Sequence, residues 1–461
     1  MREVLQKVVR QVKPRKAERE RLREVASKLV ERTNEACSEL EVPARAMLVG
    51  SAARGTWLRD DRDIDIFILF PEHLLRGELE RKGLEVARRV AGKRGKEQFA
   101  EHPYITTRIG GFDVDLVPCY DVADPSKIRS AVDRSPHHQN YVEAKLTPRL
   151  ADEILLLKQF MRGIGTYGAE LKIQGFSGYL SELLVLNYGS FRGVVETASG
   201  WEPGVVLDLR REYPDPDEAR ALFEGQPLII IDPVDPNRNA AAVVSMQNFA
   251  TFVRACQDFL REPDERFFFP KPVRSLSLRD MRERLVERGT TLFCVAFESP
   301  DLVHDVLYPQ LKKTERTLAA GLERAGFKVL RSDVWSDGKS LILLELAIAK
   351  LPKVRTHVGP PVTIEAEDFV RKHLKSRRRF TGPFVDTKGR LTFEIGRKHT
   401  RAKQILESTL KEGTAFGKHV AESLSEGYSI YEGKQVTKLC RVGKIRRFLS
   451  EYLKRCLPWL R

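Results

Sequence analysis

The chain has 461 residues, 42% of them hydrophobic and 31% charged, and this balance excludes both a wholly disordered chain and a fibre. At roughly 100–200 residues per domain, the length predicts two to four domains. The formal net charge of +15 favours a polyanionic partner, with nucleic acid ahead of an anionic membrane surface.

The first 120 residues predict charged helices followed by a small α/β unit. Residues 1–40 are charged and amphipathic, and Pro14 interrupts them, so we expect one or two helices. The apolar pattern then predicts two strands, one helix and the two strands of a hairpin, at 47–49, 64–70, 76–91, 99–109 and 112–119. Gly110-Gly111 is a typical hairpin turn between the last two strands.

The rest of the chain changes pattern twice. Residues 149–200 and 243–263 have helical periodicity, and a short apolar strand is predicted at 228–231 between them. The order strand, helix, strand, strand over residues 291–349 predicts a ferredoxin-like sandwich. A dense basic run at 371–379 follows, so positive charge is concentrated in the C-terminal part of the chain.

The sequence predicts neither a membrane span nor a disulfide framework. No stretch approaches the roughly 18 apolar residues of a transmembrane helix, and residues 1–16 lack the apolar core of a signal peptide. The six cysteines are scattered without a Cys-x-x-Cys pair, which argues against a thiolate zinc site. We therefore expect a protein of the reducing cytoplasm with no membrane partner.

The most informative motif is Gly50-Ser51 followed by Asp63-x-Asp65. Asp63 and Asp65 lie two residues apart on an apolar strand, so both carboxylates point to the same face. Unpaired carboxylates are costly to bury, and Mg²⁺, which prefers oxygen ligands and retains substrate phosphates, would neutralise them. Ser51 and Arg54 lie at a predicted strand-to-helix turn, where a hydroxyl and backbone N–H groups can hold a triphosphate.

A second metal ion near an attacking hydroxyl requires a third carboxylate. The predicted hairpin strand contains Asp113 and Asp115, which share a face, so each is a candidate by spacing alone. A lone Asp-x-Asp is often only a solvated strand face. The combination of Gly-Ser, Asp-x-Asp and an acidic hairpin strand favours a catalytic site.

These motifs resemble the polymerase β nucleotidyltransferase superfamily and, more closely, the archaeal class of CCA-adding enzymes, the tRNA nucleotidyltransferases. The similar blocks are 50–58, 100–104, 114–120, 130–138, 167–170, 175–180, 232–239 and 307–311. The resemblance implies an α+β multidomain fold with a polymerase β-like nucleotidyltransferase head at 1–148 and a helical neck at 149–265. A mixed α/β body and a ferredoxin-like tail, both binding tRNA, would then occupy 266–461.

The resemblance also implies roles for individual residues. Asp63, Asp65 and Asp115 match the catalytic, metal-binding carboxylates, which disfavours Asp113. The positions that match nucleotide-binding residues for ATP and CTP are Ser51, Arg54, His138, Lys158, Tyr167 and Arg238, the last helping to read the incoming base. From spacing alone, a snorkelling lysine at the edge of an apolar stripe is the favoured interpretation of Lys158, and Tyr167 fits a core or loop aromatic as well. Glu101 and His102 belong to a similar block but have no assigned role.

The implied activity is template-independent addition of C, C and A to the 3′ end of tRNA from CTP and ATP. One Mg²⁺ ion held by all three aspartates would activate the tRNA hydroxyl, and a second held by Asp63 and Asp65 would bind the triphosphate. The basic run 371–379 is a candidate tRNA contact, with a solvated basic helix as the alternative. Family members commonly form homodimers, so we expect one here.

Other functions remain open from the sequence. A poly(A) polymerase or another RNA 3′-terminal nucleotidyltransferase shares the three carboxylates, but a poly(A) polymerase should reject CTP. A non-catalytic RNA-binding protein is disfavoured because it has no need of converging carboxylates. A membrane-surface protein is the weakest alternative, because the basic charge lacks an apolar insertion face.

Overall fold

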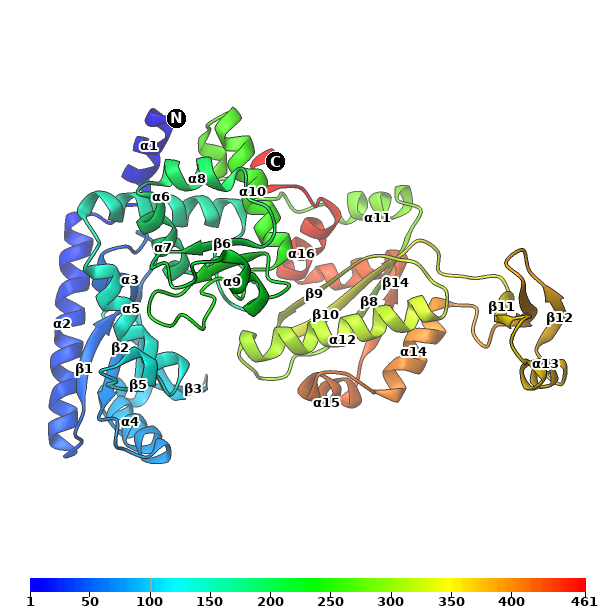
Figure 1. Ribbon diagram of the computed structural model, residues 1–461, viewed down its shortest axis with the longest axis horizontal. Helices are drawn as coiled ribbons and strands as arrows, with labels where there is room; N and C mark the ends of the chain where they lie inside the picture. Colours follow the sequence, from blue (N-terminus) through cyan, green and yellow to red (C-terminus); the bar gives the residue numbers. More distant parts are fainter. Residues whose placement is uncertain (100–101) are drawn as a thin grey trace. The chain divides into compact units, whose positions relative to one another are not determined.

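The computed structural model describes residues 1–99 and 102–461, which form two compact units (Figure 1). The first unit contains Met1–Pro272 together with Cys456–Arg461, and the second contains Val273–Arg455. Ala100 and Glu101, part of the block at 100–104, lie outside the described residues. Within the described residues, no helix combines the length and apolarity that crossing a membrane requires.

The first unit is built on a five-stranded sheet with the strand order β1-β2-β5-β4-β3. In that order the strands are β1 (Arg45–Val49), β2 (Asp63–Phe70), β5 (Phe112–Tyr120), β4 (Pro103–Ile109) and β3 (Lys96–Phe99). Strands β2 and β5 run parallel, whereas the other neighbouring pairs are antiparallel. The sheet confirms the nucleotidyltransferase-like head that the sequence predicts.

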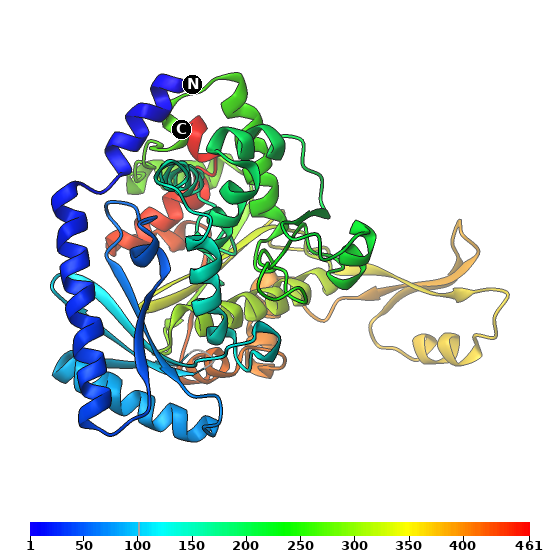
Figure 2. The ribbon, with the colours of Figure 1, turned by 60° about the vertical axis from the view of Figure 1, so that its left-hand side comes forward.

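Two helices, α2 (Lys16–Glu39) and α4 (Arg76–Ala91), cover one face of this sheet (Figures 1 and 2). Ile64, Ile66 and Ile68 of β2 point into that core and are fully buried. Because side chains alternate along a strand, Asp63 and Asp65 lie on the opposite face. The short helix α3 (Gly50–Arg54) connects β1 to this acidic face, and α5 (Arg134–Glu143) packs beside α3.

A helical region completes the first unit and confirms the predicted helical neck. Its helices are α1 (Arg2–Val12), α6 (Pro148–Ile164), α7 (Gly178–Tyr188), α8 (Phe191–Ala198), α9 (Pro216–Leu222) and α10 (Met246–Arg261). A small parallel sheet pairs β6 (Val205–Asp208) with β7 (Leu228–Ile231). The C-terminal segment packs here too, because Trp459 stacks on Phe267 with 5.6 Å between ring centroids.

The second unit contains a four-stranded sheet with the order β14-β8-β10-β9, all neighbours antiparallel. Its strands are β8 (Thr291–Glu298), β9 (Val329–Asp337), β10 (Lys339–Leu346) and β14 (Ser429–Glu432). Helices α12 (His304–Arg324), α14 (Ala402–Glu412) and α15 (Lys418–Glu426) cover one face, and α11 (Leu278–Glu287) and α16 (Gly443–Leu453) cover the other. This strand order confirms the predicted ferredoxin-like fold.

A small sheet module is inserted between β10 and α14, and we call residues 354–396 the basic module. It consists of β11 (Val354–Pro361), α13 (Glu367–Leu374), β12 (Arg379–Val385) and β13 (Arg390–Gly396), with the strand order β11-β13-β12. Phe369 of α13 packs on Phe393 of β13, with ring centroids 5.7 Å apart. The basic run 371–379 starts in α13 and ends at the first residue of β12, so it is not one basic helix.

Candidate active site

The acidic face of the head sheet brings the predicted carboxylates together. In the parallel register of β2 and β5, Asp63 lies beside Asp113 and Asp65 beside Asp115. We call these four residues the carboxylate face. Asp63 and Asp113 are exposed, and Asp113 is near Arg108, whereas Asp65 and Asp115 are only partly accessible.

Burial and repulsion from neighbouring carboxylates favour the protonated forms of Asp63, Asp65 and Asp115. Burial, followed by the charges of Asp115 and Asp63, raises the pKa of Asp65 to about 7. Burial, followed by Asp63 and Asp113, raises the pKa of Asp115 to about 6. The pKa of Asp63 is also raised, first by partial desolvation against the sheet and then by the charges of Asp61 and Asp113. A bound divalent cation would relieve this repulsion, so the donor set fits a hard metal ion.

The carboxylates do not form a closed metal site by themselves. Among the described residues, no three acidic, histidine or cysteine side chains converge as a complete metal-binding group. Such an open arrangement suits Mg²⁺, which is usually bound by one or two carboxylates together with substrate phosphates and water.

Gly50 allows the turn before α3 to approach the carboxylate face. Its φ of +79° lies in the left-handed region, and a Cβ atom at this position would collide with Oδ2 of Asp65. Gly55, at the other end of α3, also has a positive φ of +69°, but a Cβ atom there would meet nothing within 4 Å. Gly50 is therefore required by close contact with Asp65, and Ser51 follows it at the start of α3.

A cavity of about 340 Å³ opens on the carboxylate face. Its lining residues include Gly50, Arg54, Asp65, Asp115, His138, His102, Tyr104 and Tyr179. The structure thus brings two of the predicted metal ligands together with two of the predicted nucleotide-binding residues. His102 is buried, its Nδ1 lies 3.2 Å from Oε1 of Glu80, and its Nε2 has no hydrogen-bond partner among the described residues.

His138 and Arg238 meet on a carboxylate that the sequence did not single out. Nε2 of His138 lies 2.9 Å from Oδ2 of Asp232, and Nη1 of Arg238 donates to the same oxygen. Burial by itself would raise the pKa of Asp232, but the hydrogen bond and charge of His138 and the charge of Arg238 lower it to about 2. Tyr179 donates to Oδ1 of Asp232 and stacks on His138, with 3.9 Å between ring centroids. This arrangement fixes both predicted nucleotide-binding side chains.

Lys158 and Tyr167 lie behind the cavity. The Lys158 side chain is 2% exposed, and its Nζ is 3.2 Å from Oε1 of Glu182, so the surface-snorkelling alternative does not hold. Burial raises the pKa of the Tyr167 hydroxyl. Both groups lie close to Gly178. A Cβ atom at this position would be 3.2 Å from the Tyr167 hydroxyl and 3.5 Å from the Lys158 amine.

Sequence reasoning assigned no role to Tyr179, Asp232 and Glu182. Tyr179 and Asp232 belong to similar blocks, but nothing in the spacing shows that they meet His138. Glu182 carries a detectable signal, because it is the charged residue of the otherwise uncharged segment Gly178–Tyr188. A charge on a buried helix requires a partner, and that requirement marks Glu182 as a candidate.

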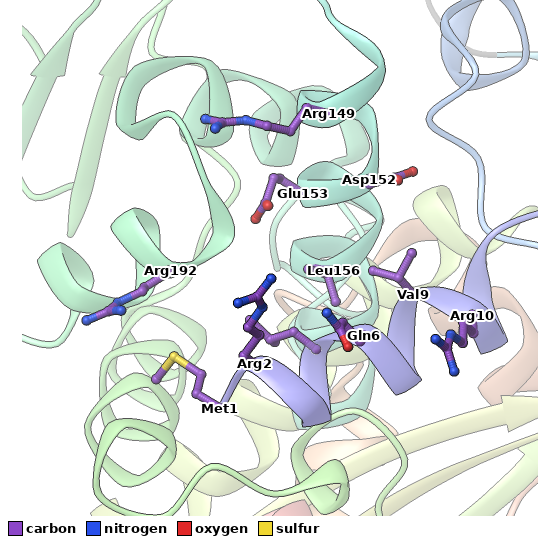
Figure 3. A pocket seen from close by; sticks show the side chains of 11 residues that line it. Met1, Arg2, Gln6, Val9, Arg10, Arg149, Asp152, Glu153, Leu156 and Arg192 are labelled. Atoms are coloured by element: carbon purple, nitrogen blue, oxygen red, sulfur yellow. The ribbon is translucent and has the colours of Figure 1, made fainter.

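A second hollow, of about 650 Å³, lies between α1, α6 and α8 (Figure 3). Figure 3 shows Arg2, Arg149 and Arg192 around it. Its two acids are already engaged, because Asp152 pairs with Lys13 and Oε2 of Glu153 accepts a hydrogen bond from the Phe191 amide. Despite its larger volume, this hollow lacks paired carboxylates available to a cation.

Comparison with known proteins matches three successive stretches of the chain to family models. Family models match a nucleotidyltransferase domain at residues 30–138, the second domain of tRNA nucleotidyltransferases at 152–269 and the C-terminal domain of CCA-adding enzymes at 288–433. The CCA-adding enzyme of Methanosarcina barkeri is 42% identical over 438 residues, covering 94% of each chain.

Other relatives extend this similarity. The CCA-adding enzyme of Halobacterium salinarum is 42% identical over 439 residues, covering 94% of this chain and 95% of that protein. Among solved structures, the Cid1 poly(U) polymerase aligns with a TM-score of 0.44 and 16% identity, covering 57% of this chain and 94% of that chain.

Proposed function

The chain belongs to the family of CCA-adding enzymes, and on that premise we propose that the carboxylate face is its catalytic centre. A CCA-adding enzyme extends the 3′ end of tRNA with C, C and A from CTP and ATP, without a nucleic-acid template. The observation that carries the proposal is the pairing of Asp65 with Asp115 on parallel strands, in one cavity with Gly50 and Arg54.

Asp63, Asp65 and Asp115 would hold two Mg²⁺ ions, with Asp113 outside the set because the Arg108 guanidinium already lies 3.8 Å from its carboxylate. When bound, the ions would lower the pKa of the tRNA 3′-hydroxyl and stabilise negative charge on the triphosphate. The raised pKa values of Asp65 and Asp115 support this assignment, because repelling carboxylates gain most from a bound cation.

The nucleotide would lie across the cavity from these carboxylates. Ser51 and Arg54 are proposed to orient the triphosphate from α3, and His138 and Arg238 to contact the base and sugar side. Asp232 supports the second pair by fixing both side chains. Lys158 and Tyr167 would complete the pocket from behind.

The tRNA is proposed to bind basic surface in the second unit. A small cavity of about 140 Å³ there is lined by Arg355, Arg378, Arg397, Lys398 and His399, with no acidic residue in its lining. This cavity and the run 371–379 suit phosphate contacts, which is how proteins grip duplex RNA whose sequence is poorly accessible.

We also propose a cytoplasmic homodimer with a head at 1–148, a neck at 149–265 and tRNA-binding domains at 266–461. Apolar side chains exposed on the basic module support self-association: Val362, Ile364, Leu374, Phe380 and Phe384. Light scattering of the purified chain tests this part, and a monomer at micromolar concentration would contradict it.

Sequencing of tRNA 3′ ends tests the function as a whole. A tRNA lacking its terminal CCA is incubated with the protein, CTP, ATP and Mg²⁺, and we expect products ending in CCA. Incorporation of A alone, with CTP rejected, would instead indicate a poly(A) polymerase. Binding of tRNA without any extension would indicate a non-catalytic RNA-binding protein.

A further inference from the structure

A buried ion network lies directly behind the catalytic cavity. It joins Arg54 of α3, Lys158 of α6 and Glu182 of α7, whose side chains are 7%, 2% and 0% exposed. Nη2 of Arg54 lies 3.0 Å from Oε2 of Glu182, and Nζ of Lys158 lies 3.2 Å from Oε1. Helices α6 and α7 pack against one another in this region (Figure 1).

Thr56 and Gln139 complete the network. The Thr56 hydroxyl donates to Oε1 of Glu182 at 2.5 Å, and its carbonyl accepts from Nζ of Lys158 at 3.0 Å. Nη1 of Arg54 donates to Oε1 of Gln139 at 2.7 Å. The network therefore ties the head, through α3 and Thr56, to helices α6 and α7.

The charges of this network do not balance. Among the described residues, Glu182 is the single carboxylate within 4 Å of either buried cation, so two positive charges share one negative charge within the network, and the Arg54 charge acts beyond it on Asp65 in the cavity wall. An unpaired buried charge is costly unless a ligand of opposite sign neutralises it. Arg54 also lines the catalytic cavity, and its buried Nε has no hydrogen-bond partner within the described part of the chain.

We propose that Glu182 is a positioning residue for the incoming nucleotide. It holds Arg54 at the cavity wall and keeps Lys158 beside it, so that the surplus positive charge faces the triphosphate. This inference rests on the proposed assignment of Arg54 to the triphosphate. Burial lowers the pKa of Lys158 while the Glu182 carboxylate opposes that shift, so Glu182 also helps to keep the amine charged.

The test replaces Glu182 with glutamine, which keeps the shape of the side chain and removes its charge. We expect the KM for CTP and for ATP to rise roughly ten- to hundred-fold, as is typical when a residue that orients a ligand-binding side chain is replaced. The effect on kcat should be smaller, and tRNA affinity should be unchanged. Dissociation constants for CTP, measured by calorimetry without tRNA, should rise by the same factor as KM.

Glu153→Gln is the matched control. Glu153 is another glutamate of the first unit that accepts a hydrogen bond, but it is only partly buried and lies in the hollow of Figure 3. The Glu153→Gln variant should leave the CTP dissociation constant unchanged. A second variant, Thr56→Val, keeps every charge and removes one hydrogen bond to Glu182, so CTP binding should weaken by about three- to ten-fold.

Thermal unfolding of each variant separates positioning from a purely structural role. A folded Glu182→Gln protein that binds CTP as tightly as the wild type would overturn the inference, even if its unfolding temperature falls. If Glu182→Gln does not fold, unchanged CTP binding by Thr56→Val overturns it instead. A wild-type protein that binds CTP but extends no tRNA would count against the proposed function, while the ratio of dissociation constants would still decide the role of Glu182.

Discussion

The carboxylate face of the first unit and the basic module of the second place their charges in opposite environments. Asp65 and Asp115 lie on a sheet, partly buried, and their pKa values are raised first by burial and then by neighbouring carboxylates. Arg377 and Arg378 of the basic module lie on exposed backbone between α13 and β12. Both regions are proposed to meet phosphate, one through bound cations and the other directly.

This difference determines how each region should tolerate change. A partly buried carboxylate has a fixed position set by its strand and by Gly50, so a single substitution removes a specific ligand. Exposed arginines contribute through long-range attraction that neighbouring arginines share. We therefore expect large, residue-specific effects at the carboxylate face and small, additive, salt-dependent effects at the basic module.

The largest expected effect is that of Asp65→Asn. Loss of one proposed metal ligand without a change of shape should lower kcat by roughly 10⁴-fold, comparable to removal of an essential catalytic group. The matched control is Asp113→Asn, on the same face and in the adjacent strand, which should change kcat by less than about three-fold. Single-turnover incorporation of labelled CTP measures both. Equal losses in the two variants would contradict the assignment of ligands.

The next effect compares two glycines with positive φ. Gly50→Ala forces Asp65 out of position, and a displacement of this kind should lower kcat by roughly 10²-fold. Gly55→Ala introduces similar backbone strain, about 1–2 kcal/mol, but no collision, so kcat should be retained. In denaturant unfolding Gly50→Ala should therefore lose at least as much stability as Gly55→Ala, and of the two variants it alone should lose activity. Normal activity of Gly50→Ala would show that the close approach to Asp65 is unimportant.

A moderate effect is expected when two charges are removed from the basic module. Arg377→Gln with Arg378→Gln should weaken tRNA binding about ten-fold, and the slope of log affinity against log salt should fall by about 1.5. The control changes net charge equally on the exposed side of α2, as Arg23→Gln with Arg32→Gln. Filter binding over a salt series measures both slopes. An identical response of the two pairs would assign the effect to net charge alone.

The smallest effect concerns pH and metal. The pKa of Asp65 is raised to about 7 and that of Asp115 to about 6 in the folded protein, from an ordinary value of 3.8. Protonation of these groups therefore stabilises the folded state fully below pH 3.8, and this stabilisation is lost as pH rises through the two raised pKa values. Mg²⁺ should therefore raise the unfolding temperature more at pH 8 than at pH 5, by about 2–4 °C.

The double variant Asp65→Asn, Asp115→Asn controls for other titrating groups in this experiment. It lacks both carboxylates, so the difference between the two pH values in the Mg²⁺-induced shift should disappear. Differential scanning fluorimetry of metal-free protein, before and after addition of Mg²⁺, measures the shift in unfolding temperature at each pH. Persistence of the difference in the double variant would place the metal effect elsewhere in the chain.

Much of the fold follows from local pattern. The helix predicted at 76–91 has those bounds as α4, and the apolar run predicted at 64–70 lies within β2, which begins at Asp63. Alternation along β2 places Asp63 and Asp65 on one face, which depends only on strand geometry. The strand–helix–strand–strand order at 291–349 similarly identified the ferredoxin-like fold, because consecutive elements usually lie side by side.

Long-range pairing decided the rest. The fourth strand of the ferredoxin-like sheet is β14, which pairs with β8 although the basic module lies between β10 and α14 in the chain. Glu182 meets Thr56 across 126 residues, and Asp232 meets His138 across 94. The hydrophobic periodicity of a segment cannot predict such long-range contacts, because they depend on how helices pack on a sheet.

The sequence by itself determined the acidic strands, the Gly-Ser turn before them and an excess of positive charge. Tertiary structure decided which carboxylates are half-buried neighbours and which, like Asp113, are exposed. It also decided that Lys158 is a buried partner of Glu182. The physical reason is that spacing fixes which face a side chain points to, whereas its pKa and partners depend on what the rest of the chain packs against that face.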